Sequence, residues 1–205
     1  MGRLISIIGN SGSGKTTLAR RLEETGQFTV FFEQHTERPF QAAFARDARY
    51  GLANQIDYLL YRAEQERAIR DQPGVCIQDG GLDLDFHVFT ALFHRRGYLS
   101  EDEFGLCERL YRALRAAMPA PEVFICLTAP LPVLAQRKAS RGRVLDISVT
   151  ADLEVMEELL QTMRDAMIRQ SSPPRWITLD TGTEDIQYGS TVDQLLRILE
   201  QPVSR

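Results

Sequence analysis

Short apolar runs alternate along most of the chain with longer segments in which apolar residues recur at the spacing of an α-helix. The short runs are nearly continuous in apolar character, which is typical of strands buried on both faces of a parallel sheet. They predict strands at residues 4–8, 29–32, 75–78, 123–127 and 176–179. The longer segments predict helices at about 15–25, 39–71 (a pair), 84–118 (a second pair), 131–139, 150–170 and 191–200. This alternation predicts an α/β fold of three layers with a five-stranded parallel sheet.

A glycine-rich stretch follows the first predicted strand directly and opens the first predicted helix. Gly9, Gly14, Lys15 and Thr16 complete the pattern G-x-x-x-x-G-K-[ST] in the structural context that a P-loop requires. Backbone N–H groups would curl around phosphate oxygens, Lys15 would reach the β- and γ-phosphates, and Thr16 would offer a hydroxyl to Mg²⁺. The motif therefore implies ATP or GTP together with Mg²⁺, and ATP with Mg²⁺ is the pair expected in the leading hypothesis below. The residues expected to hold the nucleotide are Gly9, Asn10, Ser11, Gly12, Ser13, Gly14, Lys15, Thr16 and Thr17.

Length, charge and cysteine usage narrow the class of protein further. With 205 residues, 43% of them hydrophobic, the chain fits one globular domain over residues 1–205. Its apolar runs stop far short of the ~18 residues of a membrane helix. A net charge of -4 gives no bulk attraction for nucleic acid or acidic membranes, so neither is expected as a partner. The three cysteines suit no zinc site and favour a reduced, cytoplasmic setting, and the histidines are interpreted as structural.

Glu33 lies just after the second predicted strand, where it bears on the identity of the phosphoryl acceptor. Open α/β sheets bind their ligands at this carboxyl edge. A carboxylate there would repel a phosphate acceptor, whereas it could accept a proton from a hydroxyl. Glu33 therefore favours an alcohol acceptor over a nucleoside monophosphate. The alternative is a solvated glutamate with no role beyond ending the strand.

The helix pair after Glu33 carries Gln55 and, seven residues later, Arg62. On one helix these two side chains share a face, and an amide can both donate to and accept from a base edge. Either residue alone would more often belong to a solvated helix face. Together with Glu33, however, they resemble the deoxyribonucleoside kinase family of P-loop nucleoside kinases. The resemblance implies a P-loop fold with the strand order 2-3-1-4-5.

The third predicted strand and the residues after it, GVCIQDGGLDLDFHVF, continue this resemblance. The family ends this strand with an acid and places a second acid six residues later, followed by a Phe. By resemblance, Asp79 lies near Mg²⁺ and the reacting hydroxyl, Asp85 pairs with a base-reading Arg62, and Phe89 stacks on the base. Stacking on an aromatic ring suits any nucleobase.

Two positions depart from the family's pattern. Gly80 stands where the family commonly has an Arg that would orient the 5′-hydroxyl. Phe44 stands at a sugar-binding position where many members carry a Tyr that would bond the 3′-hydroxyl. Both departures bear on the rate of phosphoryl transfer and on the preference between ribose and deoxyribose.

The fourth predicted strand leads to a basic stretch, QRKASRGRVLD, that resembles the family's lid over about residues 137–146. Arg137 and Arg141 would neutralise charge on the transferring phosphoryl group, and Arg143 would contact the nucleotide. Asp146 stands where a sugar-binding Glu is usual. Taken alone, such a basic cluster is more often a solvated face.

The leading hypothesis is a kinase that transfers the γ-phosphoryl of ATP to the 5′-hydroxyl of a (deoxy)nucleoside. Glu33 would be the base, Lys15 and the lid arginines would neutralise charge, and Thr16 with Asp79 would place Mg²⁺. The resemblance also implies a possible homodimer. The alternatives are a nucleoside monophosphate kinase, a kinase of another small alcohol, and a nucleotide-binding module without catalysis. The sequence does not choose the nucleobase or the sugar.

Overall fold

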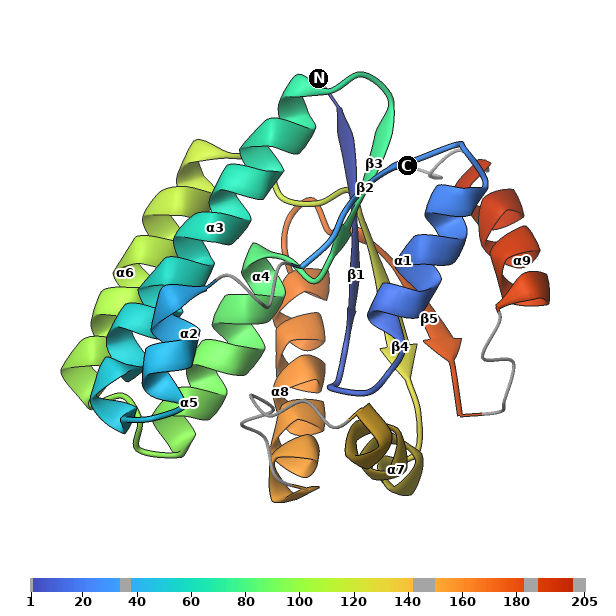
Figure 1. Cartoon of the computed structure of the whole chain (residues 1–205). Coiled ribbons are helices and arrows are strands. Elements are labelled where there is room, and N and C mark those ends of the chain that lie inside the picture. The colour runs from blue at the N-terminus through green and yellow to red at the C-terminus, as the bar shows by residue number, and fades with distance from the viewer. Residues whose placement is uncertain (1, 34–37, 142–149, 183–187, 201–205) are drawn as a thin grey trace.

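A computed structural model describes residues 2–33, 38–141, 150–182 and 188–200, and it has the predicted three layers (Figure 1). The five predicted strands are present, within two residues of the predicted ends. They are β1 (Arg3–Gly9), β2 (Thr29–Phe31), β3 (Val75–Asp79), β4 (Val123–Thr128) and β5 (Arg175–Asp180). All neighbouring strands pair in parallel, in the order β2-β3-β1-β4-β5. The predicted fold class and strand order are confirmed.

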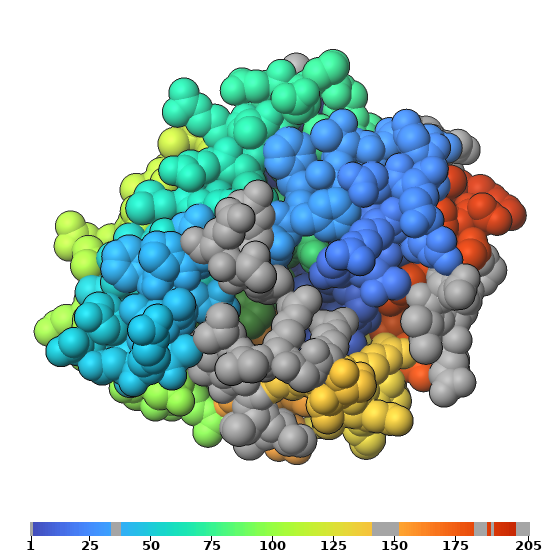
Figure 2. Space-filling view, viewed as in Figure 1, coloured from blue at the N-terminus to red at the C-terminus, as the bar shows by residue number. Residues whose placement is uncertain are grey.

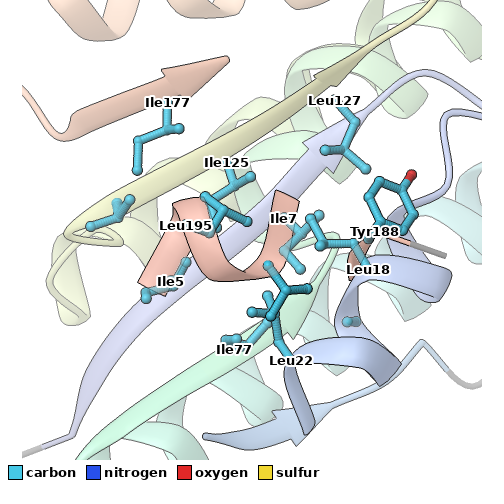
Figure 3. Close-up of a cluster of buried hydrophobic side chains, with 13 residues drawn as sticks. Ile5, Ile7, Leu18, Leu22, Ile77, Ile125, Leu127, Ile177, Tyr188 and Leu195 are labelled. Atoms are coloured by element: carbon cyan, nitrogen blue, oxygen red, sulfur yellow. The ribbon is translucent and has the colours of Figure 1, made fainter. Parts of the chain in front are cut away.

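Alternate residues of each strand divide the hydrophobic core between the two faces of the sheet. Helices α1 (Lys15–Glu24) and α9 (Gly189–Glu200) cover one face (Figure 3). The strand residues packed against them are Ile5, Ile7, Ile77, Val123, Ile125, Leu127 and Ile177. The intervening residues Ile8, Phe124 and Cys126 pack instead with α8 (Thr150–Ile168). Because both faces are covered, the strands need apolar residues at successive positions, which explains their continuous apolar runs.

The second face also carries a thick helical region, built from the two predicted helix pairs. The first pair consists of α2 (Pro39–Phe44), a 3₁₀ turn (Ala48–Tyr50) and α3 (Gly51–Asp71). The second consists of α4 (Leu82–Leu84), η2 (Asp85–Thr90), α5 (Ala91–Arg95) and α6 (Glu101–Ala117), and α7 (Leu131–Arg141) follows β4. Helix α6 packs on the outside of α3, away from the sheet (Figure 1). The side chains of these helices fill the space between the carboxyl end of β3 and the surface of the protein.

The segment η2 is a π-helical turn, which the apolar spacing did not predict. Thr90 Oγ1 donates a hydrogen bond of 3.0 Å to the backbone oxygen of Asp85, five residues earlier. π-Helical turns are rare, and they are frequent at functional sites. A capping box begins α6, with Ser100 and Glu103 bonded reciprocally. Within the described part of the chain, no helix combines the length and apolar character needed to cross a bilayer.

Candidate active site

The loop between β1 and α1 curls back on itself at the carboxyl end of β1. Lys15 Nζ donates to the backbone oxygens of Gly9 at 3.0 Å and Asn10 at 3.1 Å, so the lysine closes the curl. Gly14 has φ +97°, and a Cβ there would lie 2.2 Å from the Tyr188 hydroxyl oxygen. No other residue fits this position without moving the tyrosine. The geometry fits the phosphate-binding role expected for residues 9–17.

Other side chains anchor this loop to the second layer of helices. Asn10 Nδ2 donates to the Leu153 backbone oxygen at 2.8 Å and to Glu157 Oε2 at 3.2 Å, both on α8. The Asn10 Oδ1 accepts from the Ser11 N–H at 2.8 Å. Ser13 is fully buried. The loop is therefore held in its curl from both of its sides, which reduces the ordering that a bound nucleotide would require.

A hydroxyl and a carboxylate meet where β3 ends beside the phosphate loop. Thr16 Oγ1 donates to Asp79 Oδ2 at 2.7 Å. The other carboxylate oxygen of Asp79 is buried and has no hydrogen-bond partner. Mg²⁺ prefers oxygen ligands and is usually held by one or two carboxylates together with phosphates and water. Thr16 and Asp79 therefore fit Mg²⁺, although no group of three His, Cys, Asp or Glu residues suited to a metal occurs among the described residues.

The guanidinium group of Arg62 on α3 contacts two carboxylates, those of Asp85 and Glu33. Its Nε donates to Asp85 Oδ2 at 2.8 Å, as the expected pair. Its Nη1 donates to the Asp79 backbone oxygen at 3.0 Å and to Gln65 Oε1 at 3.1 Å. Its Nη2 lies 3.3 Å from Glu33 Oε2, a contact that the sequence did not predict. We call Arg62, Asp85 and Glu33 the Arg62 cluster.

Burial and charge oppose each other within the Arg62 cluster. Burial raises the pKa of the Asp85 carboxyl to about 6, although the nearby Arg62 acts in the opposite direction. Burial alone would lower the pKa of Arg62, but Asp85 and Glu33 outweigh it and raise that pKa. Arg62 therefore stays charged at any physiological pH. The Glu33 side chain is 19% exposed against 1% for Arg62, so Glu33 forms the open side of the cluster.

Gln55 lies deeper in the same region and is buried. Its side-chain amide contacts Thr90 on the π-helical turn, with 2.8 Å between Oε1 and Thr90 Oγ1. Phe89, on the same turn, is half-buried and packs against the cluster of apolar residues around α8. Its stacking on a base stays a prediction. Figure 2 shows green atoms of the segment after β3 in a hollow between the cyan α2 and α3 side and the blue α1 side.

Phe44 is part of the hydrophobic core of the helical region. Its ring centroid lies 4.7 Å from that of Phe93 and 5.1 Å from that of Tyr98. Only 6% of the residue is exposed. These contacts give Phe44 a packing role, whereas its contact with a sugar stays a prediction.

The predicted lid is described only in part. Arg137 on α7 donates from Nη2 to the backbone oxygen of Thr181 at 2.7 Å, directly after β5. Thr181 Oγ1 in turn donates to the Ser13 backbone oxygen at 3.1 Å, which connects α7 to the phosphate loop. Arg141 ends α7, and nothing of its side chain is described. Arg143 and Asp146 lie outside the described residues, so the roles of these lid residues stay predictions.

Two residues at the site were missed by the sequence reasoning. Tyr188 has φ +51°, unusual for a residue with a side chain, and its hydroxyl lies 3.4 Å from the Ser13 backbone oxygen. Tyr61 on α3 donates from its hydroxyl to the Phe32 backbone oxygen at 3.2 Å, next to Glu33. Tyr61 looked like an ordinary aromatic residue on a helix and Tyr188 lay outside the predicted elements, so only their long-range contacts reveal them.

The phosphate loop after β1, the parallel sheet and the acids after β2 and β3 define a P-loop protein of the α/β class. The profile of the deoxynucleoside kinase family matches residues 5–197, which is most of the chain. The chain belongs to this family.

Two relatives and one solved structure illustrate the similarity. The chain is 25% identical to deoxyadenosine/deoxycytidine kinase of Bacillus subtilis (strain 168) over 150 residues, covering 72% of this chain and 69% of that protein. It is 24% identical to thymidylate kinase of Xylella fastidiosa (strain M12) over 205 residues, covering 97% of this chain and 88% of that protein. The structure of deoxyadenosine kinase from M. mycoides with the products dCMP and a flexible dCDP has a TM-score of 0.81 at 17% identity, covering 96% of this chain and 98% of that one. At this identity the structural likeness establishes the shared fold.

Proposed function

We propose that the protein transfers the γ-phosphoryl of ATP to the 5′-hydroxyl of a nucleoside or deoxynucleoside, and its family favours the deoxynucleoside. One observation carries the proposal: a chain of contacts joins the phosphate loop to the acceptor acid. Thr16 bonds Asp79 at 2.7 Å, the Asp79 backbone oxygen accepts from Arg62 at 3.0 Å, and Arg62 lies 3.3 Å from Glu33. These contacts fix the position of Glu33 relative to the phosphate loop, as in-line phosphoryl transfer requires.

In this mechanism the partly exposed Glu33 accepts the proton of the acceptor hydroxyl as the oxygen attacks. Lys15 neutralises charge on the phosphate oxygens, and the curled loop fixes their position. When bound between Thr16 and Asp79, Mg²⁺ would neutralise charge on the β- and γ-phosphates. Arg137 would bring a further cation from α7 to the edge of the phosphate loop.

Two further observations support a nucleoside as the acceptor. The Bacillus subtilis relative is by name a kinase of deoxyadenosine and deoxycytidine. Gln55, whose side chain contacts Thr90, carries an amide that can donate to or accept from a base edge. Neither observation selects purine over pyrimidine.

Replacement of Glu33 by Gln tests the proposal. We expect turnover to fall by about 10²- to 10⁴-fold, the usual contribution of a general base, while ATP affinity stays near wild type. Acceptor-dependent ADP release, measured by a coupled assay across the common nucleosides and deoxynucleosides, gives the turnover. Glu64→Gln, which changes an exposed glutamate on α3, is the matched control. Unchanged turnover in Glu33→Gln would remove Glu33 as the base.

A nucleoside monophosphate kinase is the second candidate, because the chain also matches a thymidylate kinase along 97% of its length. Against it, a carboxylate at position 33 would repel a phosphorylated acceptor. The same assay with deoxythymidine and with its monophosphate separates the two candidates. ADP release that depends on the monophosphate alone would favour the second, and ATP binding without any acceptor-dependent release would favour a non-catalytic binder.

A further inference from the structure

We propose that Arg62 is a positioning residue that holds Glu33 toward the phosphate loop, and that position 80 is glycine because the Arg62 guanidinium fills the space of a side chain there. The inference deepens the proposed function and rests on it, since it assigns the group that orients the base. It also changes the role expected for Arg62, from reading a nucleobase to orienting a carboxylate.

The guanidinium of Arg62 has little capacity left for a ligand. Four of its contacts are with the protein: Asp85, Gln65, the Asp79 backbone oxygen and Glu33. A guanidinium has five N–H groups, and this one is 1% exposed. One N–H is left, so to read a base edge with two donors it would have to give up a bond to one of these acceptors, which is costly. Holding Glu33 requires no such change.

Gly80 lies against the same nitrogen that contacts Glu33. A Cβ built on Gly80 would lie 2.7 Å from Arg62 Nη2 and 3.1 Å from Arg62 Cζ. The first distance is shorter than real Cβ contacts allow, so a side chain at position 80 would displace Nη2 from its place beside Glu33. In place of the arginine that the family commonly carries at position 80, α3 therefore supplies a cation at this point in the site.

Residues of helix α3 bond the backbone just before Glu33 as well as the Glu33 side chain. Gln65 Nε2 donates to the Phe32 backbone oxygen at 2.9 Å, and Tyr61 Oη donates to the same oxygen at 3.2 Å. Gln65 also accepts a hydrogen bond from Arg62, so the residue that holds the Phe32 backbone is bonded to the residue that holds the Glu33 side chain. These contacts together fix the position of Glu33 after β2. An isolated ion pair on the surface would not fix it.

Two glycine variants test the inference with matched backbone strain. Gly80 has φ +91° and Gly74, just before β3, has φ +83°, but a Cβ on Gly74 would meet nothing within 4 Å. Alanine at either position carries a similar strain. We expect Gly80→Ala to lower kcat by about 10²-fold through misplacement of the acid, with the KM for ATP unchanged. Gly74→Ala should leave kcat within about twofold of wild type.

Variants at Arg62 complete a double-mutant cycle. Arg62→Met should lower kcat by about 10²-fold or more, and Arg62→Lys should recover about tenfold of that loss by restoring the cation. In the Arg62→Met background, Gly80→Ala should cost no more than Gly74→Ala, because no guanidinium is left to displace. Equal kcat in Gly80→Ala and Gly74→Ala would overturn the inference while leaving the proposed function intact.

Crystal structures of the wild type and Gly80→Ala supply a readout that does not depend on activity. The wild type should show Arg62 Nη2 on the Glu33 carboxylate, and Gly80→Ala should show this contact broken. If no nucleoside supports ADP release by the wild type, the proposed function fails, and these structures still decide the positioning of Glu33. A Glu33 side chain that keeps its place in Gly80→Ala overturns the inference.

Discussion

Two arginines in the helical region, the buried Arg62 and the half-buried Arg115, each bridge two acids, yet their surroundings differ. Arg62 joins Asp85 and Glu33 in the Arg62 cluster. The second arginine, Arg115 on α6, bonds both carboxylate oxygens of Glu66, at 2.9 and 3.0 Å, and one oxygen of Asp83 at 3.1 Å. We call Arg115, Glu66 and Asp83 the Arg115 cluster.

The acids of the Arg115 cluster are saturated by protein groups. Asp83 accepts a second bond, from Tyr111 Oη at 2.7 Å, and Glu66 accepts from the Leu82 N–H at 3.3 Å. The Arg62 cluster instead reaches the partly exposed Glu33 and adjoins Asp79, which keeps one buried oxygen without a partner. The comparison teaches that ion-pair chemistry alone does not mark a site. Arg115 Nε is also buried without a partner, so what distinguishes the Arg62 cluster is the unpartnered carboxylate oxygen of Asp79 together with the contact of Asp79 with the phosphate loop.

The largest effect should follow from breaking the Arg115 cluster. Arg115→Met leaves two buried acids without their cation, so we expect the free energy of unfolding to fall by about 3–5 kcal/mol. Urea unfolding measures this loss. The control is Arg112→Met, four residues from Glu108 on the exposed face of α6, with an expected change of about 0.5 kcal/mol or less. Equal losses in the two variants would show that the Arg115 cluster contributes nothing of its own.

Two acids separated by a single residue, Asp83 and Asp85, sharpen the comparison. Asp83→Asn must lose one of its two accepted bonds, because an amide has only one oxygen, and it should lower the free energy of unfolding by about 1–3 kcal/mol. Its kcat/KM should stay near wild type. Asp85→Asn can still accept from Arg62 Nε but loses the charge that steadies the guanidinium, and its kcat/KM should fall about tenfold. Urea unfolding gives the stability of both variants, and steady-state kinetics gives their kcat/KM. An equal loss of kcat/KM in the two variants would show that the two clusters do not differ in function.

The smallest effect concerns His87, whose Nε2 lies 3.1 Å from Tyr111 Oη. Tyr111 donates to Asp83, so its oxygen accepts from the neutral imidazole N–H. Burial lowers the pKa of His87 from its ordinary 6.5, even though Asp83 acts the other way. The unfolded chain therefore binds the proton more readily, and stability is lost as the pH falls below 6.5.

Replacement of His87 by Gln removes this titration. At a pH above 7, the wild type should be more stable than His87→Gln by about 1 kcal/mol, the value of one buried hydrogen bond. This advantage should shrink as the pH falls below 6.5. Urea unfolding of both proteins across this range provides the measurement. A difference that does not change with pH would contradict the lowered pKa.

The sequence was sufficient for the features that depend on local pattern. The apolar runs predicted the strands, and the contiguous GNSGSGKTT motif predicted the curl that Lys15 closes. It also paired Arg62 with Asp85 correctly, through the family resemblance. The contact of Arg62 with Glu33 was missed, because it depends on how α3 lies against the end of β2. Asp83 was likewise passed over, since its partner Arg115 is 32 positions away.

The π-helical turn over Asp85–Thr90 constrains the length of the chain at this point. Such a turn holds one residue more than an α-helical turn. Because the turn already takes up one extra residue, a further inserted residue would rotate everything after it by about 100°. Leu92 would then take the place of Phe93, which belongs to a different hydrophobic cluster. Insertions, which surface loops accept readily, should therefore be excluded from this turn in any functional descendant of the chain.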